Sequence, residues 1–79
     1  MAGYKRAKFY RVFHYATGPK AGTTTIIVAV EGGGSYWYRD LSPGRAHHII
    51  DLLRNEDPVW VELESGMLQV SVEPVGEGD

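Results

Sequence analysis

The chain has no cysteine, and this absence excludes several chemistries together. Without thiols there is no disulfide scaffold, no thiolate metal site and no cysteine nucleophile. Long apolar runs are also missing. The longest, Ile26 to Val30, is far shorter than the ~18–20 residues that a membrane span needs. The basic N-terminal stretch holds no apolar core of a secretory signal. We therefore expect a cytoplasmic protein without a membrane partner.

The chain is also short, and its 79 residues leave room for one small domain. Its content of 43% hydrophobic and 23% charged residues is typical of a globular fold and argues against disorder. We expect a single domain over residues 1–73. Residues 74–79, in which glycine alternates with Glu77 and Asp79, are expected to form a flexible acidic tail.

The small net charge of −2 conceals an uneven distribution along the chain. Residues 1–20 have no acid and carry five cations, Lys5, Arg6, Lys8, Arg11 and Lys20. Residues 21–79 hold all ten acids and only three arginines, so net charges of +5 and −7 combine to −2. Such asymmetry has two interpretations: a basic first strand that pairs with acidic neighbours, or a basic surface that binds a partner.

Strand-forming residues predominate over 8–15 and 23–31, and a shorter run covers 36–39. A Gly-Pro loop over 16–22 and a glycine-rich turn over 31–35 join these segments. The connections are too short for a crossover, so we expect a three-stranded antiparallel meander. Both alternating faces of the second segment are largely apolar, which predicts a central strand that is covered on both sides.

The next segment has the signature of a helix over residues 43–55. Ser42 is a candidate N-cap, and Pro43 suits the first helical position because its missing N–H would be unpaired there. Apolar residues recur on one stripe at about 100° per residue; they are Ala46, Ile49, Ile50 and Leu53. The Asp57-Pro58 pair ends the element, since a residue before proline avoids the helical region.

Two further strands are expected, over 59–63 and 67–73, joined by a three-residue hairpin loop in which Gly66 takes the left-handed conformation. The resulting order is βββαββ. A single helix can cover one face of such a sheet. The sequence therefore predicts a two-layer α+β domain with a five-stranded, mainly antiparallel sheet.

One helix of this length, about 20 Å, cannot cover both faces of the sheet. The alternation over 59–63 places Trp60 on the side away from the helix, and Met67 is expected there too. A second copy of the chain is a natural cover, because cyclic dimers are the commonest assemblies. Surplus aromatics in the third strand would add to this interface, which we assign to Trp60, Met67, Tyr36, Trp37 and Tyr38. We thus expect a homodimeric protein-interaction module with a regulatory or adaptor role.

The alternative is a domain that binds single-stranded nucleic acid. Cations that follow the phosphates and rings that stack on bases are both present in the first strand. The residues that we assign to this site are Lys5, Arg6, Lys8, Tyr10 and Arg11. Alternation places Phe9 and Phe13 on the other side from Tyr10, and both phenylalanines are expected in the core.

Catalytic and metal-binding patterns are weak. His47 and His48 are neighbours on a helix and point about 100° apart, so they cannot hold one ion together. The glycines at 32–34 lead into a strand, whereas phosphate-binding loops lead into a helix. No serine has an obvious neighbouring base. We expect no enzyme activity, no cofactor and no metal site.

Overall fold

The computed structural model describes residues 3–70 and contains the predicted elements in the predicted order. They are β1 (Tyr4–His14), β2 (Thr24–Val30), β3 (Ser35–Leu41), α1 (Pro43–Asn55), β4 (Val59–Glu62) and β5 (Leu68–Val70). All strand pairs are antiparallel, and the sheet order is β3-β2-β1-β4-β5. The α+β fold is therefore confirmed. The expected tail over 74–79 and the end of the last predicted strand lie outside the described residues.

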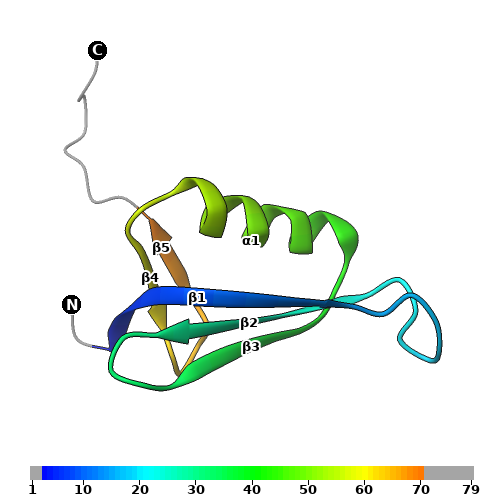
Figure 1. The fold of residues 1–79 in the computed structure, drawn as a ribbon, viewed down its shortest axis with the longest axis horizontal. Helices are drawn as coiled ribbons and strands as arrows, with labels where there is room; N and C mark the ends of the chain where they lie inside the picture. Colours follow the sequence, from blue (N-terminus) through cyan, green and yellow to red (C-terminus); the bar gives the residue numbers. More distant parts are fainter. Residues whose placement is uncertain (1–2, 71–79) are drawn as a thin grey trace, which may run out of the picture.

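The first strand is longer than expected, and two different strands share it. The beginning of β1, Tyr4 to Arg6, pairs with β4, and its remainder pairs with β2. Between these parts the register shifts, because Ala7 pairs with Val30 while Phe9 pairs with Ala29. Lys8 is thus the extra residue of a β-bulge, and bulges bend and twist a strand. Accordingly, β4 and β5 run steeply across the direction of β1, β2 and β3 (Figure 1).

Helix α1 begins and ends where the local sequence predicts. Ser42 has an extended backbone, and its Oγ accepts a hydrogen bond from the Arg45 N–H at 3.4 Å. Pro43 occupies the first turn, and the chain leaves the helix at Glu56. The connection from β3 is short, so α1 packs over β2 and β3, the strands with which it has most of its contacts.

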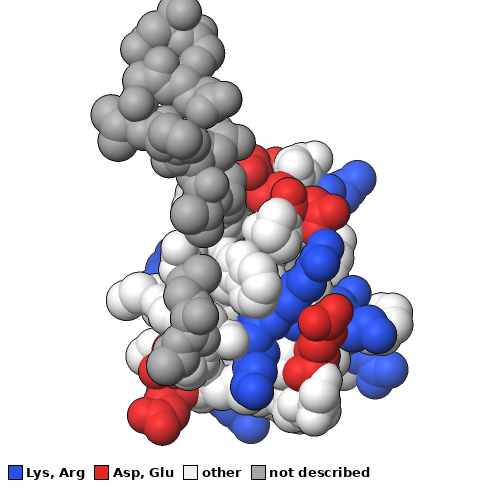
Figure 2. Space-filling view, turned by 90° about the vertical axis from the view of Figure 1, so that its left-hand side faces the viewer, with Lys and Arg blue, Asp and Glu red and all other residues white. Residues whose placement is uncertain are grey.

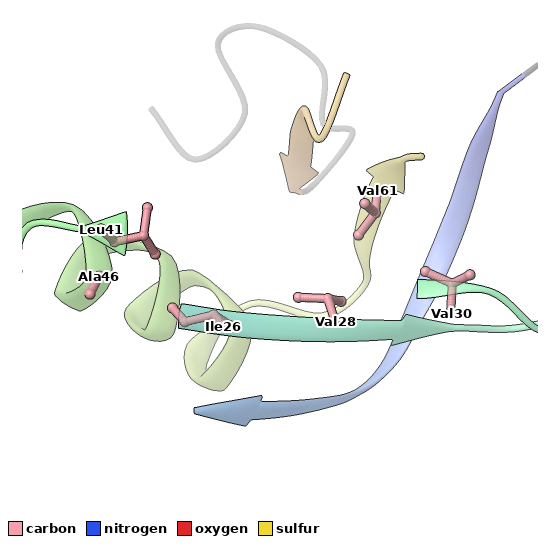
Figure 3. Close-up of a cluster of buried hydrophobic side chains, with 6 residues drawn as sticks. All are labelled: Ile26, Val28, Val30, Leu41, Ala46 and Val61. Carbon is pink, nitrogen blue, oxygen red and sulfur yellow. The ribbon is translucent and has the colours of Figure 1, made fainter. Parts of the chain in front are cut away.

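The core lies between the sheet and α1. On β2 the alternating residues Ile26, Val28 and Val30 all point toward the helix and are at most 5% exposed. Three residues from other elements complete the buried cluster, as Figure 3 shows: Leu41, Ala46 and Val61. The alternation predicted for this strand is therefore confirmed on its helix side.

The hairpin of β4 and β5 covers the rest of this same side. Its turn contains Gly66 at φ +77°, as the sequence predicted. The hydroxyl of Tyr38 donates to the Gly66 carbonyl oxygen at 2.7 Å, and that of Tyr36 donates to the Ser65 carbonyl oxygen at 3.4 Å. The turn is thereby held against two tyrosines of β3. One side of the β1–β3 sheet is covered by α1 and this hairpin, and no helix or strand of residues 3–70 covers the other side.

Candidate functional site

The uncovered side of β1, β2 and β3 is the candidate site. Directly paired residues of antiparallel strands point to the same side of a sheet. Phe13 pairs with Thr25, and Ile27 pairs with both Arg11 and Trp37, so these side chains all point away from the buried Ile26 and its partners. We call this surface the open face. It comprises Phe9, Arg11, Phe13, Ile27, Ala29, Ser35, Trp37 and Arg39, together with Thr25, which is only 3% exposed.

Three aromatic rings are exposed on the open face. Phe9 is 69% exposed, Phe13 is 40% exposed and Trp37 is 43% exposed. The expectation that Phe9 and Phe13 belong to the core is therefore wrong. The physical reason is that α1 and the β4–β5 hairpin both pack on the opposite side, so no helix or strand within residues 3–70 covers these rings.

Each of these rings has a cation beside it. The Lys8 Nζ lies 5.7 Å from the centre of the Phe9 ring, and the Arg11 guanidinium lies 6.0 Å from that of Phe13. The closest pair is Arg39 over Trp37, at 4.5 Å. Such contacts lie within the range of cation–π attraction, worth about 0.5–1 kcal/mol at an exposed site.

No acidic residue occupies the open face as defined. The acid nearest to it along the chain is Asp40, which follows Arg39 at a second irregularity, between the Ile26–Tyr38 and Thr24–Leu41 pairs. Asp40 has φ +54°, and its carboxylate forms an ion pair with Lys20 of the β1–β2 loop at 3.2 Å. The cations on the open face therefore have aromatic neighbours in place of carboxylates.

The structure separates the five residues predicted for a protein interface. Tyr36 and Tyr38 are half-buried against the core, and Trp37 between them is on the open face. Burial raises the pKa of Tyr38 to about 12, with a smaller contribution from Tyr36.

The other two predicted interface residues lie at the β4–β5 hairpin. Trp60 is half-buried on β4, on the side away from the core residues Val59 and Val61. Met67 is 60% exposed, and its Sδ accepts a hydrogen bond from Tyr4 at 3.3 Å. Two strands, β2 and β1, lie between Trp37 and Trp60.

The five residues predicted to bind nucleic acid are also divided. Arg11 belongs to the open face, and Lys8 lies beside the Phe9 ring at the bulge. Tyr10 pairs with Val28 and points to the helix side. Lys5 and Arg6 both lie on the part of β1 that pairs with β4, and Arg6 forms an ion pair with Asp57 at 3.0 Å. Figure 2 looks onto this end of the molecule, where Lys and Arg groups form a band with Asp and Glu groups beside it.

Sequence reasoning missed Phe9, Phe13 and Arg39 as surface residues. The signal for two of them was present, because the alternation along β1 places Phe9, Arg11 and Phe13 on one face. Only the position of the helix decides whether that face is core or surface. Nothing in the sequence indicated that Arg39 would lie over Trp37.

Other kinds of site find little support in this part of the chain. Among residues 3–70, no three His, Asp or Glu side chains gather as metal ligands would. His14 lies beside Thr24, with its Nδ1 3.0 Å from the threonine Oγ1. The helix of the described region is not long and apolar enough to cross a membrane. Comparisons of the chain with models of protein families, with curated proteins and with solved structures find no match.

Proposed function

We propose that the protein binds single-stranded nucleic acid on the open face. The observation that carries this proposal is the set of three exposed rings, Phe9, Phe13 and Trp37, each with a cation beside it on one side of one sheet. Proteins hold single strands by stacking bases on aromatic rings while cations follow the phosphates. The open face supplies both kinds of group at neighbouring positions.

Charge favours an anionic ligand over a second copy of the chain on this surface. A symmetric dimer through the open face would gather Arg11 and Arg39 of both copies in one interface, and the face has no carboxylate to pair with them. Like charges placed together in an interface cost binding energy. A nucleic acid brings the phosphates that these cations lack.

The exposed rings also favour single strands over duplexes. A base can stack on Phe9, Phe13 or Trp37 only when its own face is free, and in a duplex both faces are occupied by neighbouring bases. The phosphates of a bound strand can then reach Lys8, Arg11 and Arg39. With three phosphate contacts, the logarithm of the binding constant should fall with the logarithm of the salt concentration with a slope of about −2.

The test is fluorescence anisotropy with a labelled oligonucleotide of about twelve thymidines, a length within the site sizes of known single-strand binders. Trp37→Ala should weaken binding about fivefold to 150-fold, because loss of one stacking ring typically removes ~1–3 kcal/mol. The control is Met67→Ala, which removes an even more exposed side chain, 60% against 43% for Trp37, away from the open face. Equal effects of the two substitutions, or no binding at low salt, would refute the proposal.

A further inference from the structure

Strand β1 has a free edge beyond its bulge. On one side β1 pairs with β2 along most of its length, from Ala7 to His14. On the other side β4 pairs only with Tyr4 to Arg6. No strand of the described region occupies that side over residues 8–14, although β1 continues well past β4 (Figure 1). Within residues 3–70, the strand position beside β1, which we call the vacant row, is filled by β4 at its beginning and has no strand over the rest.

The hydrogen bonds at the end of β1 indicate which backbone groups face the vacant row. The Tyr15 N–H donates to the Thr23 carbonyl oxygen at 3.0 Å, and the Tyr15 carbonyl oxygen accepts from Gly22 at 2.8 Å. The groups of Tyr15 thus point toward β2. Direction alternates along an antiparallel strand, so the N–H and C=O groups of Tyr10, Val12 and His14 point to the vacant row. Exposed edges of this kind are templates for pairing with another chain.

On the helix side of the sheet, the surface beside the vacant row is apolar and only partly covered. Tyr10 and Val12 point to the helix side, yet they are 37% and 39% exposed because α1 lies over β2 and β3. A cleft of about 240 Å³ lies where the β4 row ends, and Tyr10, Leu53 and Val59 are among the residues that line it. An added strand could bury apolar side chains against these groups.

We propose that the β1 edge over Lys8–His14 binds an extended acidic segment of another protein as a sixth strand. The segment would run antiparallel to β1 and in line with β4. This site is separate from the open face, because it uses the backbone edge of β1 and the helix side of the sheet.

The acidic character of the partner follows from the charges around the edge. Lys8 and Arg54 line the cleft beside this edge, and residues 8–14 contain no acid. Glu56 and Asp57 also line it, but Asp57 is already paired with Arg6. A second copy is disfavoured as the occupant. Antiparallel pairing of two β1 edges would bring the cations of one copy beside those of the other, and like charges on paired strands are destabilising.

The probe for this site is a fluorescein-labelled peptide of alternating valine and glutamate, about nine residues long, which suits strand addition. Its control is the same peptide N-methylated at every residue, which keeps the charge but cannot donate backbone hydrogen bonds. We expect the methylated peptide to bind at least about 30-fold more weakly, since each lost bond costs about threefold to tenfold in affinity. Equal binding of the two peptides would mean attraction by charge alone and would overturn strand addition.

On the protein side, Val12→Pro removes an N–H that faces the vacant row and is not used within the sheet. Proline is tolerated on an edge strand in that orientation, and thermal unfolding checks that the variant folds. Peptide affinity should fall about threefold to tenfold, while oligonucleotide affinity should stay unchanged. Trp37→Ala should show the opposite pattern.

Three results count against the proposal. The first is that Trp37→Ala loses peptide binding while Val12→Pro keeps it, which would place the peptide on the open face. The second is a concentration-dependent dimer in sedimentation that Val12→Pro abolishes, which would make a second copy the occupant. The third is no saturable peptide binding by the wild-type protein at low salt.

Discussion

The contact between the β4–β5 turn and β3 can be tested with Gly66→Ala. Gly66 is buried and has φ +77°, a conformation that disfavours any residue with a Cβ. A Cβ at this position would also meet the ring of Tyr36, with the hydroxyl oxygen 2.8 Å away and two ring carbons closer still. The substitution therefore combines a backbone penalty with a steric one.

Neither the turn at Gly66 nor the Tyr36 ring can move freely to relieve this clash. The Gly66 N–H donates to the Glu62 carbonyl oxygen at 2.7 Å, and the Ser65 N–H donates to the Glu62 carboxylate at 3.0 Å, so the turn is fixed. The Tyr36 ring lies 4.7 Å from that of Tyr38 and is bonded to the turn itself. Left-handed backbone costs about 1–2 kcal/mol for a residue other than glycine, and overpacking costs about 1–3 kcal/mol. Gly66→Ala should thus destabilise the fold by about 2–5 kcal/mol.

Gly33→Ala is the matched control. Gly33 has φ +91°, and nothing lies within 4 Å of a Cβ built on it, so only the backbone penalty applies. Urea unfolding should show a loss of about 1–2 kcal/mol for Gly33→Ala and a clearly larger loss for Gly66→Ala. Adding Tyr36→Leu to Gly66→Ala removes the clashing atoms, because leucine ends before the ring's ε and ζ positions, and a double-mutant cycle should recover the steric share. Equal losses for the two glycine variants would refute the reasoning.

Two further predictions concern α1 and the buried tyrosine. Gly44→Ala should raise the free energy of unfolding by about 0.5–1 kcal/mol, because Gly44 is helical and a Cβ there meets open space; thermal unfolding measures this, and a loss of stability would contradict it. Tyr38 should make the fold less stable as pH rises from about 10 to about 12, because its pKa is about 12 in the fold against 10.0 for an exposed tyrosine, so the unfolded chain loses its proton first. The slope should reach at most about 1.4 kcal/mol per pH unit. It should be shallower in Tyr38→Phe, and an unchanged slope in urea unfolding at alkaline pH would exclude Tyr38 as its source.

Elements with local signals could be predicted from the sequence. The cap at Ser42, the proline that follows it and the stripe through Ala46 define α1 without reference to the rest of the chain. The turn at Gly66 is local in the same way. On β2 the alternation identifies the buried residues of the helix side, whereas the expected cover on its other side is not found within residues 3–70. In each case the determining interactions lie within a few residues.

The order of the strands and the exposure of β1 could not be predicted, because both depend on distant contacts. Nothing local indicates that Tyr4 pairs with Glu62, or that this pairing stops after Arg6. The hydrophobicity of Phe9 predicts a core position. Whether its face of the sheet is buried, however, depends on the side on which α1 packs. The short connection from β3 keeps α1 over β2 and β3, and the open face lies on the reverse side.

The bulge at Lys8 divides the basic strand into two parts with different surroundings. Before the bulge, Arg6 pairs with Asp57, which agrees with the interpretation that basic and acidic segments stabilise the fold. An exposed pair of this kind contributes about 0–1 kcal/mol. After the bulge, Lys8 and Arg11 lie beside aromatic rings, and neither forms an ion pair among residues 3–70. We propose phosphates or a partner's carboxylates as the anions for these two cations. The pairing of β1 with β4 stops just before the same bulge, so no strand of residues 3–70 lies beside the β1 edge that follows it.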